Sequence, residues 1–393
     1  MKQISWRTTG ETVVDQVEAR GQLLRDLGRL EDESAPFGPF LFDPEAAGSK
    51  NCENLIGQVA VPLGVAGPIW FDLKVGAKAR EQQQQILLPL ATTEGALVAS
   101  VNRGCKGLRE ASQVEVEIEQ LGMSRAPVFN CPTPVVAQEF VAWLEENQGR
   151  LAKSAEQTSS HLKFLSWQIF SEDNLVFVRL NFDTDQAMGM NMVSIGVQRL
   201  LGEVQAAFPA IKMTALSSNM CTDKKVSGLN RRLGRGRRVR ARTLVDEAVL
   251  RQVLKTNLVS FLTTFHDKIE VGSRLAEVVG ANMHFANIGA AMLLATGQDI
   301  AHTVDLSSGD TTAREVDGQL ELAIELPSVP VGVVGGGTGL ATQRQARNII
   351  SAEVVDSDLL AATIGAGILA GELSGLAALS SNTLACAHQN LAR

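Results

Sequence analysis

The chain has 393 residues, of which 45% are hydrophobic and 20% are charged, and its formal net charge is −7. The apolar fraction excludes a disordered chain, and the length allows two or three domains of roughly 150 residues each. A net negative charge argues against a protein that coats nucleic acid. The five cysteines are odd in number and form no C-x-x-C pair. This pattern indicates reduced thiols in a cytoplasmic protein rather than a disulfide framework or a zinc site.

The N-terminal part of the chain predicts a small helical segment. Residues 9–31 carry apolar side chains at helical spacing and run into an acidic loop with proline, so we expect a helical unit over residues 1–51. The first residues lack the apolar core of a secretory signal. The most apolar stretch, 359–387, is interrupted by Glu372, and neither half reaches the ~20 apolar residues of a membrane span. These features predict a soluble protein without membrane contact.

Strand and helix patterns alternate over the next part of the chain. Residues 57–75 are typical of strands broken by glycine and proline, and a helix is expected to begin at Thr92. Residues 112–121 alternate apolar and polar side chains, which predicts a half-buried strand. From Pro127 onward the expected order of elements is β-α-β-β-α-β. That order indicates a ferredoxin-like small domain over residues 127–215.

The remainder of the chain is expected to be mainly helical. The predicted elements are helices over 246–265, 284–297 and 341–352, a strand pair near 314–333, and a long helix of small residues over 357–392. Together the patterns predict an α+β fold. Residues 52–126 and 216–393 would form one large, mainly helical domain, into which the ferredoxin-like domain is inserted.

Polar clusters interrupt apolar or small-residue surroundings, where unpaired polar groups are costly. They are residues 92–100, 185–192, 217–228, 282–299 and 331–340. Taken alone, each has an ordinary structural explanation. Glu94 would be an acid at a helix start, Lys224 a solvated lysine, and His388 an exposed histidine near the chain end. The arginines between 231 and 240 are typical of a solvated strand edge or a phosphate contact.

Several standard enzyme signatures are missing from the sequence. Histidines, cysteines and acids show no metal-ligand spacing, which predicts that no metal is bound, and there is no G-x-S-x-G elbow or P-loop. Residues 365–370 match the dinucleotide fingerprint, but they do not follow a strand and no acid follows Glu372 to hold a ribose. We therefore expect these glycines to serve close helix packing. A nicotinamide site in this chain would not use a Rossmann fold.

Eight sequence strings occur together in one order from Cys52 to the C-terminus. They are CENLIGQVAVPLGVAGP, LATTEGALVASVNRGC, GMSRAPV, AMGMNM, SSNMCTDKK, NMHFANIGAAMLLATGQD, VGVVGGGTGL and AGELSGLAAL. In content and order they resemble the 3-hydroxy-3-methylglutaryl-coenzyme A (HMG-CoA) reductase family. The chain stops five residues after His388, which favours the catalytic portion of the class I form, since class II members carry a further C-terminal flap domain.

The resemblance implies a reaction and an assembly. The reaction is the four-electron reduction of HMG-CoA to mevalonate and CoA, with two NADPH consumed. The assembly is a homodimer or homotetramer whose active sites lie between subunits. The implied partners are the acyl thioester and further copies of the chain, without nucleic acid or membrane.

The resemblance also assigns residues. The family's catalytic side chains fall on Glu94, Lys224, Asp299 and His388. Hydride attack on a thioester builds negative charge on the carbonyl oxygen, which the ammonium of Lys224 would stabilise. Glu94 would donate a proton at the aldehyde stage, in a cluster that titrates together with Asp299 and Lys224, and His388 would protonate the departing CoA thiolate. The implied substrate residues are Ser217, Asp223, Lys225, Lys268, Arg125, Asn287 and Arg103.

The implied cofactor residues depart from the family pattern at two places. The whole set is Ser159, Ser160, His161, Gln186, Met188, Gly189, Met190, Asn191, Gly335, Gly336, Gly337 and Thr338. Gln186 stands where the family has an aspartate, and Asp185 is expected to point elsewhere. Ser159, Ser160 and His161 replace a Ser-Arg-Phe string at the NADPH 2′-phosphate, so one arginine is lost, but no acid is expected there. Because His161 and Lys163 could serve a phosphate, NADPH is favoured over NADH.

The sequence leaves three other interpretations of the function open. A paralogue could reduce a different acyl thioester carried on CoA or on a carrier protein. The enzyme could instead oxidise mevalonate with NAD. A catalytically inactive binding protein is disfavoured, because all four catalytic residue types are present.

Overall fold

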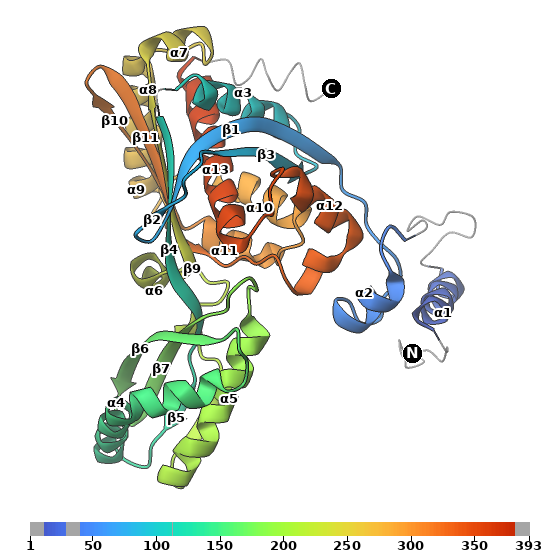
Figure 1. Cartoon of the computed structure of the whole chain (residues 1–393), viewed down its shortest axis with the longest axis vertical. Helices are drawn as coiled ribbons and strands as arrows, with labels where there is room; N and C mark the ends of the chain where they lie inside the picture. The colour runs from blue at the N-terminus through green and yellow to red at the C-terminus, as the bar shows by residue number, and fades with distance from the viewer. Residues whose placement is uncertain (1–11, 29–39, 112, 382–393) are drawn as a thin grey trace.

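The computed structural model describes residues 12–28, 40–111 and 113–381. Two helices precede the main body, α1 (Val13–Asp26) and α2 (Pro44–Lys50). Thr12 and Asp15 form a capping box at the start of α1, and α2 begins at a proline behind the Asp43 cap. The described part of the N-terminal segment thus contains two short helices (Figure 1).

The strands form one mixed sheet that runs the length of the molecule. They are β1 (Leu63–Val75), β2 (Lys78–Ala79), β3 (Gln84–Ala91), β4 (Gln113–Arg125), β5 (Val128–Asn130), β6 (Lys163–Glu172), β7 (Leu175–Asp183), β8 (Lys212–Ala215), β9 (Arg235–Val245), β10 (Asp310–Val316) and β11 (Gln319–Val329). The main order is β10-β11-β9-β4-β7-β5-β8, with β1 beside β4, β3 beside β1, and β6 beside β7. The long strand β4 pairs with β9 along most of its length and with β7 only over residues 123–125. It therefore connects the two halves of the molecule (Figure 1).

Helices cover this sheet at several places. They are α3 (Leu97–Arg109), α4 (Pro134–Glu156), α5 (Met190–Ala207), α6 (Gly228–Leu233), α7 (Glu247–Gln252), α8 (Leu258–Phe265), α9 (Ser273–Leu275), α10 (Phe285–Ala295), α11 (Thr303–Leu306), α12 (Ala341–Ile349) and α13 (Ser357–Ser380). Short helical turns complete the set, namely η1 (Asn219–Cys221), η2 (His266–Gly272, a π-helix), η3 (Ile300–His302) and η4 (Gly336–Gly339). Mixed helix and sheet agree with the predicted α+β class. The larger half was expected to be mainly helical, but it also contains the strands β1 to β4 and β9 to β11.

Helix α13 is the central element of the larger half. It packs against α3, α10 and strands β9 and β11. By length and composition it could cross a membrane, but its most apolar window is entirely buried inside the fold, as in the core helix of a globular domain. Gly104 of α3 allows the two helices to approach closely, because a Cβ added there would lie 1.8 Å from the Ala370 carbonyl oxygen of α13.

A second apolar core belongs to the lower lobe of Figure 1. It is built from buried side chains between Met123 and Ile211, on β5 to β7, α4 and α5. The chain order is β5-α4-β6-β7-α5-β8, and the spatial order is β8-β5-β7-β6. This is the arrangement of a split βαβ motif.

Two local predictions are wrong. Helix α3 begins at Leu97 rather than Thr92, because Ala96 adopts a left-handed conformation with φ of 67°, so Glu94 lies in the turn before the helix. The arginines of β9 are not at a solvated edge, since β9 lies between β4 and β11. Arg235 and Arg237 are only 0% and 5% exposed.

Candidate active site

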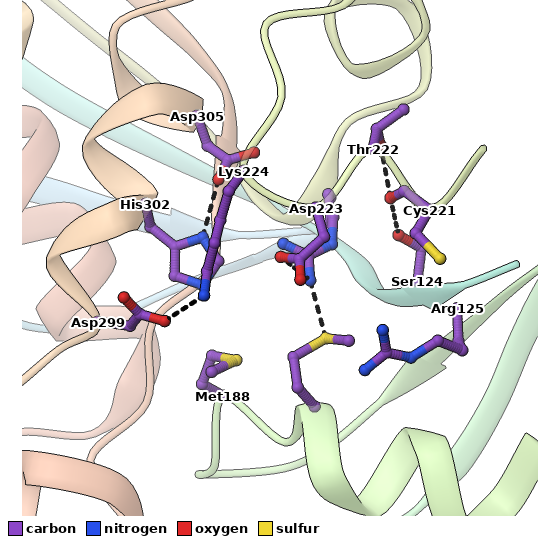
Figure 2. Close-up of polar contacts among 12 residues, drawn as sticks. Ser124, Arg125, Met188, Cys221, Thr222, Asp223, Lys224, Asp299, His302 and Asp305 are labelled. Atoms are coloured by element: carbon purple, nitrogen blue, oxygen red, sulfur yellow. Dashed lines mark hydrogen bonds and ion pairs between the residues drawn. The ribbon is translucent and has the colours of Figure 1, made fainter. Parts of the chain in front are cut away.

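Lys224 and Asp299 form the centre of the candidate site. The Nζ atom of Lys224 lies 2.6 Å from Oδ2 of Asp299 (Figure 2). Asp299 caps the short helix η3 and accepts the Ala301 N–H at 3.0 Å. Partial burial is the largest single influence on Asp299 and opposes its ionisation, but the hydrogen bonds from Lys224 and the Ala301 N–H, together with nearby positive charge, outweigh it. The pKa of Asp299 is therefore lowered, and the pair is a carboxylate with an ammonium.

The loop that carries Lys224 is held by buried groups behind it. Lys224 itself has a positive φ of 55°, a conformation that non-glycine residues adopt rarely. The buried amide of Asn230 donates to the Thr222 carbonyl at 3.0 Å, and Asp223 forms a 3.0 Å ion pair with Arg235. These contacts fix the direction in which the lysine leaves the loop.

Glu94 has a separate partner. The Asn287 side-chain amide donates to Oε2 of Glu94 at 2.8 Å. Glu94 comes from the turn before α3, and Asn287 from the first turn of α10. The structure thus brings two predicted site residues together across 193 positions of sequence.

Arg125 at the end of β4 contacts another predicted residue. Its guanidinium donates to the hydroxyls of Ser217 at 2.9 Å and Ser194 at 2.8 Å. The Ser217 hydroxyl also lies 3.0 Å from the sulfur of Cys221, which in turn accepts the Ala126 N–H. Figure 2 shows Arg125 and Cys221 on one side of Asp223 and the Lys224–Asp299 pair on the other.

A cavity of about 680 Å³ opens beside Asp299. Eight of the predicted cofactor residues line it, namely Met188, Gly189, Met190, Asn191, Gly335, Gly336, Gly337 and Thr338. The two loops that supply them are joined by a hydrogen bond of 2.8 Å from the Val333 N–H to the Gln186 carbonyl. Gly335 and Gly336 have positive φ values of 83° and 56°, and an added Cβ would meet nothing within 4 Å. Both residues are exposed, so a ligand can approach this backbone closely.

Gln186 does not line this cavity with the other members of its segment. Its Oε1 atom accepts the Ser357 N–H at 2.9 Å, which satisfies one of the free donors at the start of α13. In this structure the side chain of Gln186 therefore makes a structural contact at the start of α13.

His161 has an acidic neighbour. Its Nδ1 atom lies 2.8 Å from Oδ2 of Asp185. Asp185 reaches this position because its backbone is left-handed, with φ of 56°. The string Ser159 to His161 itself holds no acid, as the sequence indicated, but the fold brings Asp185 to it, and Asp185 does not line the cavity beside Asp299.

Three further predicted residues of the described ranges, Lys225, Lys268 and Arg103, make no hydrogen bond or ion pair with the Lys224–Asp299 pair. Lys225 and Lys268 are exposed, Lys268 on the π-helical turn η2, and their side chains make no polar contact in the described ranges. The Arg103 guanidinium donates to the Ser374 hydroxyl and carbonyl of α13, at 3.0 and 2.6 Å. His388 lies outside the described residues.

The sequence prediction missed some residues at the site. Lys50 and Asn51 at the end of α2 line the cavity, as does Gln298, whose Oε1 accepts the Gly332 N–H at 3.0 Å. The position of Gln298 next to the predicted catalytic residue Asp299 could have indicated that it lies at the site. No local pattern places α2 at the cavity.

Comparison with known proteins agrees with the resemblance of the eight strings. A family model described as hydroxymethylglutaryl-coenzyme A reductase matches residues 16–393. Two archaeal relatives are each named 3-hydroxy-3-methylglutaryl-coenzyme A reductase. The Haloferax volcanii protein is 41% identical over 362 residues, and the Pyrococcus abyssi protein 40% over 364, each alignment covering 91% of this chain and 88% of the relative.

Solved structures have the same fold. A class II 3-hydroxy-3-methylglutaryl-CoA reductase from Streptococcus pneumoniae, bound to NADPH in open conformations, matches with a TM-score of 0.65 at 18% identity. The match covers 96% of this chain and all of that one. The fold and site define an α+β protein with a charged centre beside a glycine-lined cavity. The chain belongs to the hydroxymethylglutaryl-coenzyme A reductase family.

Proposed function

We propose that the chain reduces HMG-CoA to mevalonate and CoA in a four-electron reaction that consumes two NADPH. One observation carries the proposal. Asp299 both lies in the wall of the 680 Å³ cavity and forms the ion pair with Lys224. The Lys224 ammonium, which can stabilise a developing oxyanion, is therefore next to a space for a nucleotide cofactor. The names of relatives at about 40% identity support this activity.

The cavity fits a nicotinamide dinucleotide. Its volume is within the usual range of cofactor pockets, roughly 300–1,000 Å³. The exposed backbone of Gly335 and Gly336 suits phosphate oxygens, and Lys50 adds a positive charge to the wall. NADPH, when bound, supplies the hydride. The solved relative bound to NADPH supports this choice of cofactor, and the site would lie outside a Rossmann fold.

Residues of the chain itself then have separate roles at the substrate carbonyl group. Lys224 stabilises negative charge on the substrate oxygen, an effect of a few kcal/mol. Asp299, with its lowered pKa, stays ionised and keeps the ammonium in place. The proton for the aldehyde stage therefore comes from Glu94, which Asn287 orients. We assign protonation of the CoA thiolate to His388.

Substrate recognition falls to the polar groups around η1. Arg125, Ser217, Asp223 and Lys225 would bind the dicarboxylic acyl group, with the first two already joined by a hydrogen bond. We propose that Lys268, exposed on η2, pairs with substrate in a neighbouring subunit of a homodimer or homotetramer. Arg103 would act indirectly, through its contacts with α13.

We further propose a class I enzyme in the cytoplasm. The 18% identity to a class II structure, against 41% to an archaeal relative, supports a place outside class II. The described cysteines are free thiols, which suits a reducing compartment. The two separate apolar cores support a division into 1–51, a large domain of 52–126 and 216–393, and a small NADP(H)-binding domain of 127–215.

The test is spectrophotometric oxidation of NADPH and NADH with HMG-CoA, with mevalonate measured as product. We expect HMG-CoA-dependent oxidation of two NADPH per mevalonate. Oxidation of NADPH with other acyl thioesters but not with HMG-CoA would instead identify the paralogue. Gln186→Asp is included as a variant. Because Gln186 bonds Ser357 rather than lining the cavity, we expect Gln186→Asp to lower stability more than cofactor affinity.

A further inference from the structure

A buried histidine lies close to the Asp299 carboxylate that pairs with Lys224. His302 is 1% exposed and stands on the same short turn as Asp299. Its Nδ1 atom lies 2.8 Å from Oδ2 of Asp305. Its Nε2 atom is also buried, and within residues 12–28, 40–111 and 113–381 it has no hydrogen-bond partner. An unpaired buried polar atom of this kind is costly, so its presence needs an explanation.

Asp305 determines which ring nitrogen of His302 carries the proton. Asp305 is 0% exposed, and its other oxygen accepts the Asn230 amide at 3.1 Å. The positive charge of Arg235 also acts on this carboxylate. A carboxylate only accepts hydrogen bonds, so Nδ1 of His302 must be the donor. In the neutral ring, Nε2 is then an acceptor.

We propose that His302 is a positioning residue for Lys224, an inference that rests on the proposed function. The Lys224 ammonium has three protons, and Asp299 accepts one. The Nε2 lone pair accepts a second when the lysine turns its third proton to the substrate oxygen. Lys224 and His302 both lie close enough to Asp299 to influence its carboxylate, and Figure 2 shows the His302 ring between Asp305 and Asp299.

The charge around the ring gives this arrangement a pH dependence. The groups that face it are Asp299 and Asp305 from its own segment, Lys224 from the η1 loop, and Arg235 from β9. A neutral ring accepts from the ammonium. A protonated ring would have no lone pair and would repel the ammonium, so acid should lower activity through this contact.

The test is the pH profile of kcat for NADPH oxidation with HMG-CoA. We expect His302→Ala to lower kcat roughly tenfold, the effect of one lost hydrogen bond, with KM for NADPH nearly unchanged. His302→Gln keeps an acceptor that does not titrate, so it should restore kcat and remove the loss of activity on the acid side. The matched control is His266→Gln, since His266 forms a 2.9 Å pair with Asp267 on the surface. It should leave the profile unchanged.

Equal kcat in His302→Ala and His302→Gln, with the acid side of the profile unaltered, would overturn the inference. A second measurement does not need the variants to fold. Nitrogen NMR of the unaltered chain labelled at histidine should show His302 protonated at Nδ1 and not at Nε2. A proton on Nε2 of the neutral ring would contradict the proposal. If the unaltered chain does not oxidise NADPH with HMG-CoA, the proposed function is wrong. If the chain is active but the His302 variants have the same pH profile of kcat as the unaltered enzyme, only the inference about His302 is wrong.

Discussion

The Lys224 ammonium and the Asp299 carboxylate lie 2.6 Å apart, although the two residues are 75 positions apart in the chain. The pair joins the η1 loop to the turn that follows α10. Lys224 reaches it from a strained left-handed backbone, which Asn230 and Arg235 hold in place from behind. Such strain persists where the surrounding contacts determine the conformation.

Removal of the ammonium should abolish most of the activity. Lys224→Met keeps the length of the side chain but not its charge, and we expect kcat to fall about 10²–10³-fold, the usual cost of one oxyanion donor. KM for NADPH should change little. The control is Lys78→Met, at an exposed lysine of β2. A kcat within a few-fold of the unaltered enzyme would refute the role of Lys224.

The same pair makes a prediction about pH. Because the pKa of Asp299 is lowered from its ordinary 3.8, the stability that the carboxylate contributes is fully present above that value. It is lost only as the pH falls through the lowered pKa. Loss of kcat between about pH 5 and 7 must then come from another group, because a carboxyl group of this kind does not titrate there. Asp299→Asn should leave the midpoint of that acid-side loss in place, while lowering kcat at every pH.

Much of this site could be predicted from the sequence, because its residues lie in eight short sequence strings whose residue types and order are specific to one family. It could not predict the burial of Arg235 and Arg237, since the flanking strands β4 and β11 come from distant parts of the chain. The start of α3 was misplaced because Ala96 is left-handed, which alanine rarely is. The pairing of His161 with Asp185 depends on a left-handed residue as well. In each case the missing information was a backbone conformation or a strand neighbour set by tertiary packing.

Gly104 should not tolerate a methyl group. A Cβ there would lie 1.8 Å from the Ala370 carbonyl oxygen, a backbone atom that cannot rotate away. We expect Gly104→Ala to separate α3 from α13 and to cost at least about 2–3 kcal/mol of stability. Gly149→Ala is the matched control, since it is also helical but meets nothing within 4 Å, and it should stabilise by up to about 1 kcal/mol. Urea unfolding of both variants decides the matter, and equal midpoints would contradict the packing.

The buried carboxylate of Glu372 explains why an acid interrupts the apolar helix α13. It is 0% exposed and accepts the N–H groups of Met283 and His284, at 3.0 Å each, and the Thr311 hydroxyl at 2.7 Å. Nδ1 of the His284 ring lies 3.0 Å from the same carboxylate.

Glu372→Gln should therefore be strongly destabilising. The new NH₂ group would face donors where an oxygen accepts now, and we expect a loss of about 3 kcal/mol of unfolding free energy. Glu353→Gln, at an exposed acid, serves as the control and should leave the urea midpoint unchanged. If both variants unfold at the midpoint of the parent protein, the carboxylate is not needed to hold this turn.

The contact between His161 and Asp185 should affect the choice between NADPH and NADH. Resemblance puts Ser159 to His161 near the 2′-phosphate, and the Asp185 carboxylate lies 2.8 Å from His161. A carboxylate there repels a phosphate and occupies the imidazole that would bind it. We expect Asp185→Asn to raise the ratio of kcat/KM for NADPH to that for NADH by roughly three- to tenfold at low salt, and less at high salt.

Asp173→Asn is a close control, because Asp173 is also an exposed aspartate with positive φ, in the β6–β7 turn. A ratio that stays constant in Asp185→Asn would mean that the phosphate binds elsewhere, and a ratio that rises equally in both variants would reduce the effect to general surface charge.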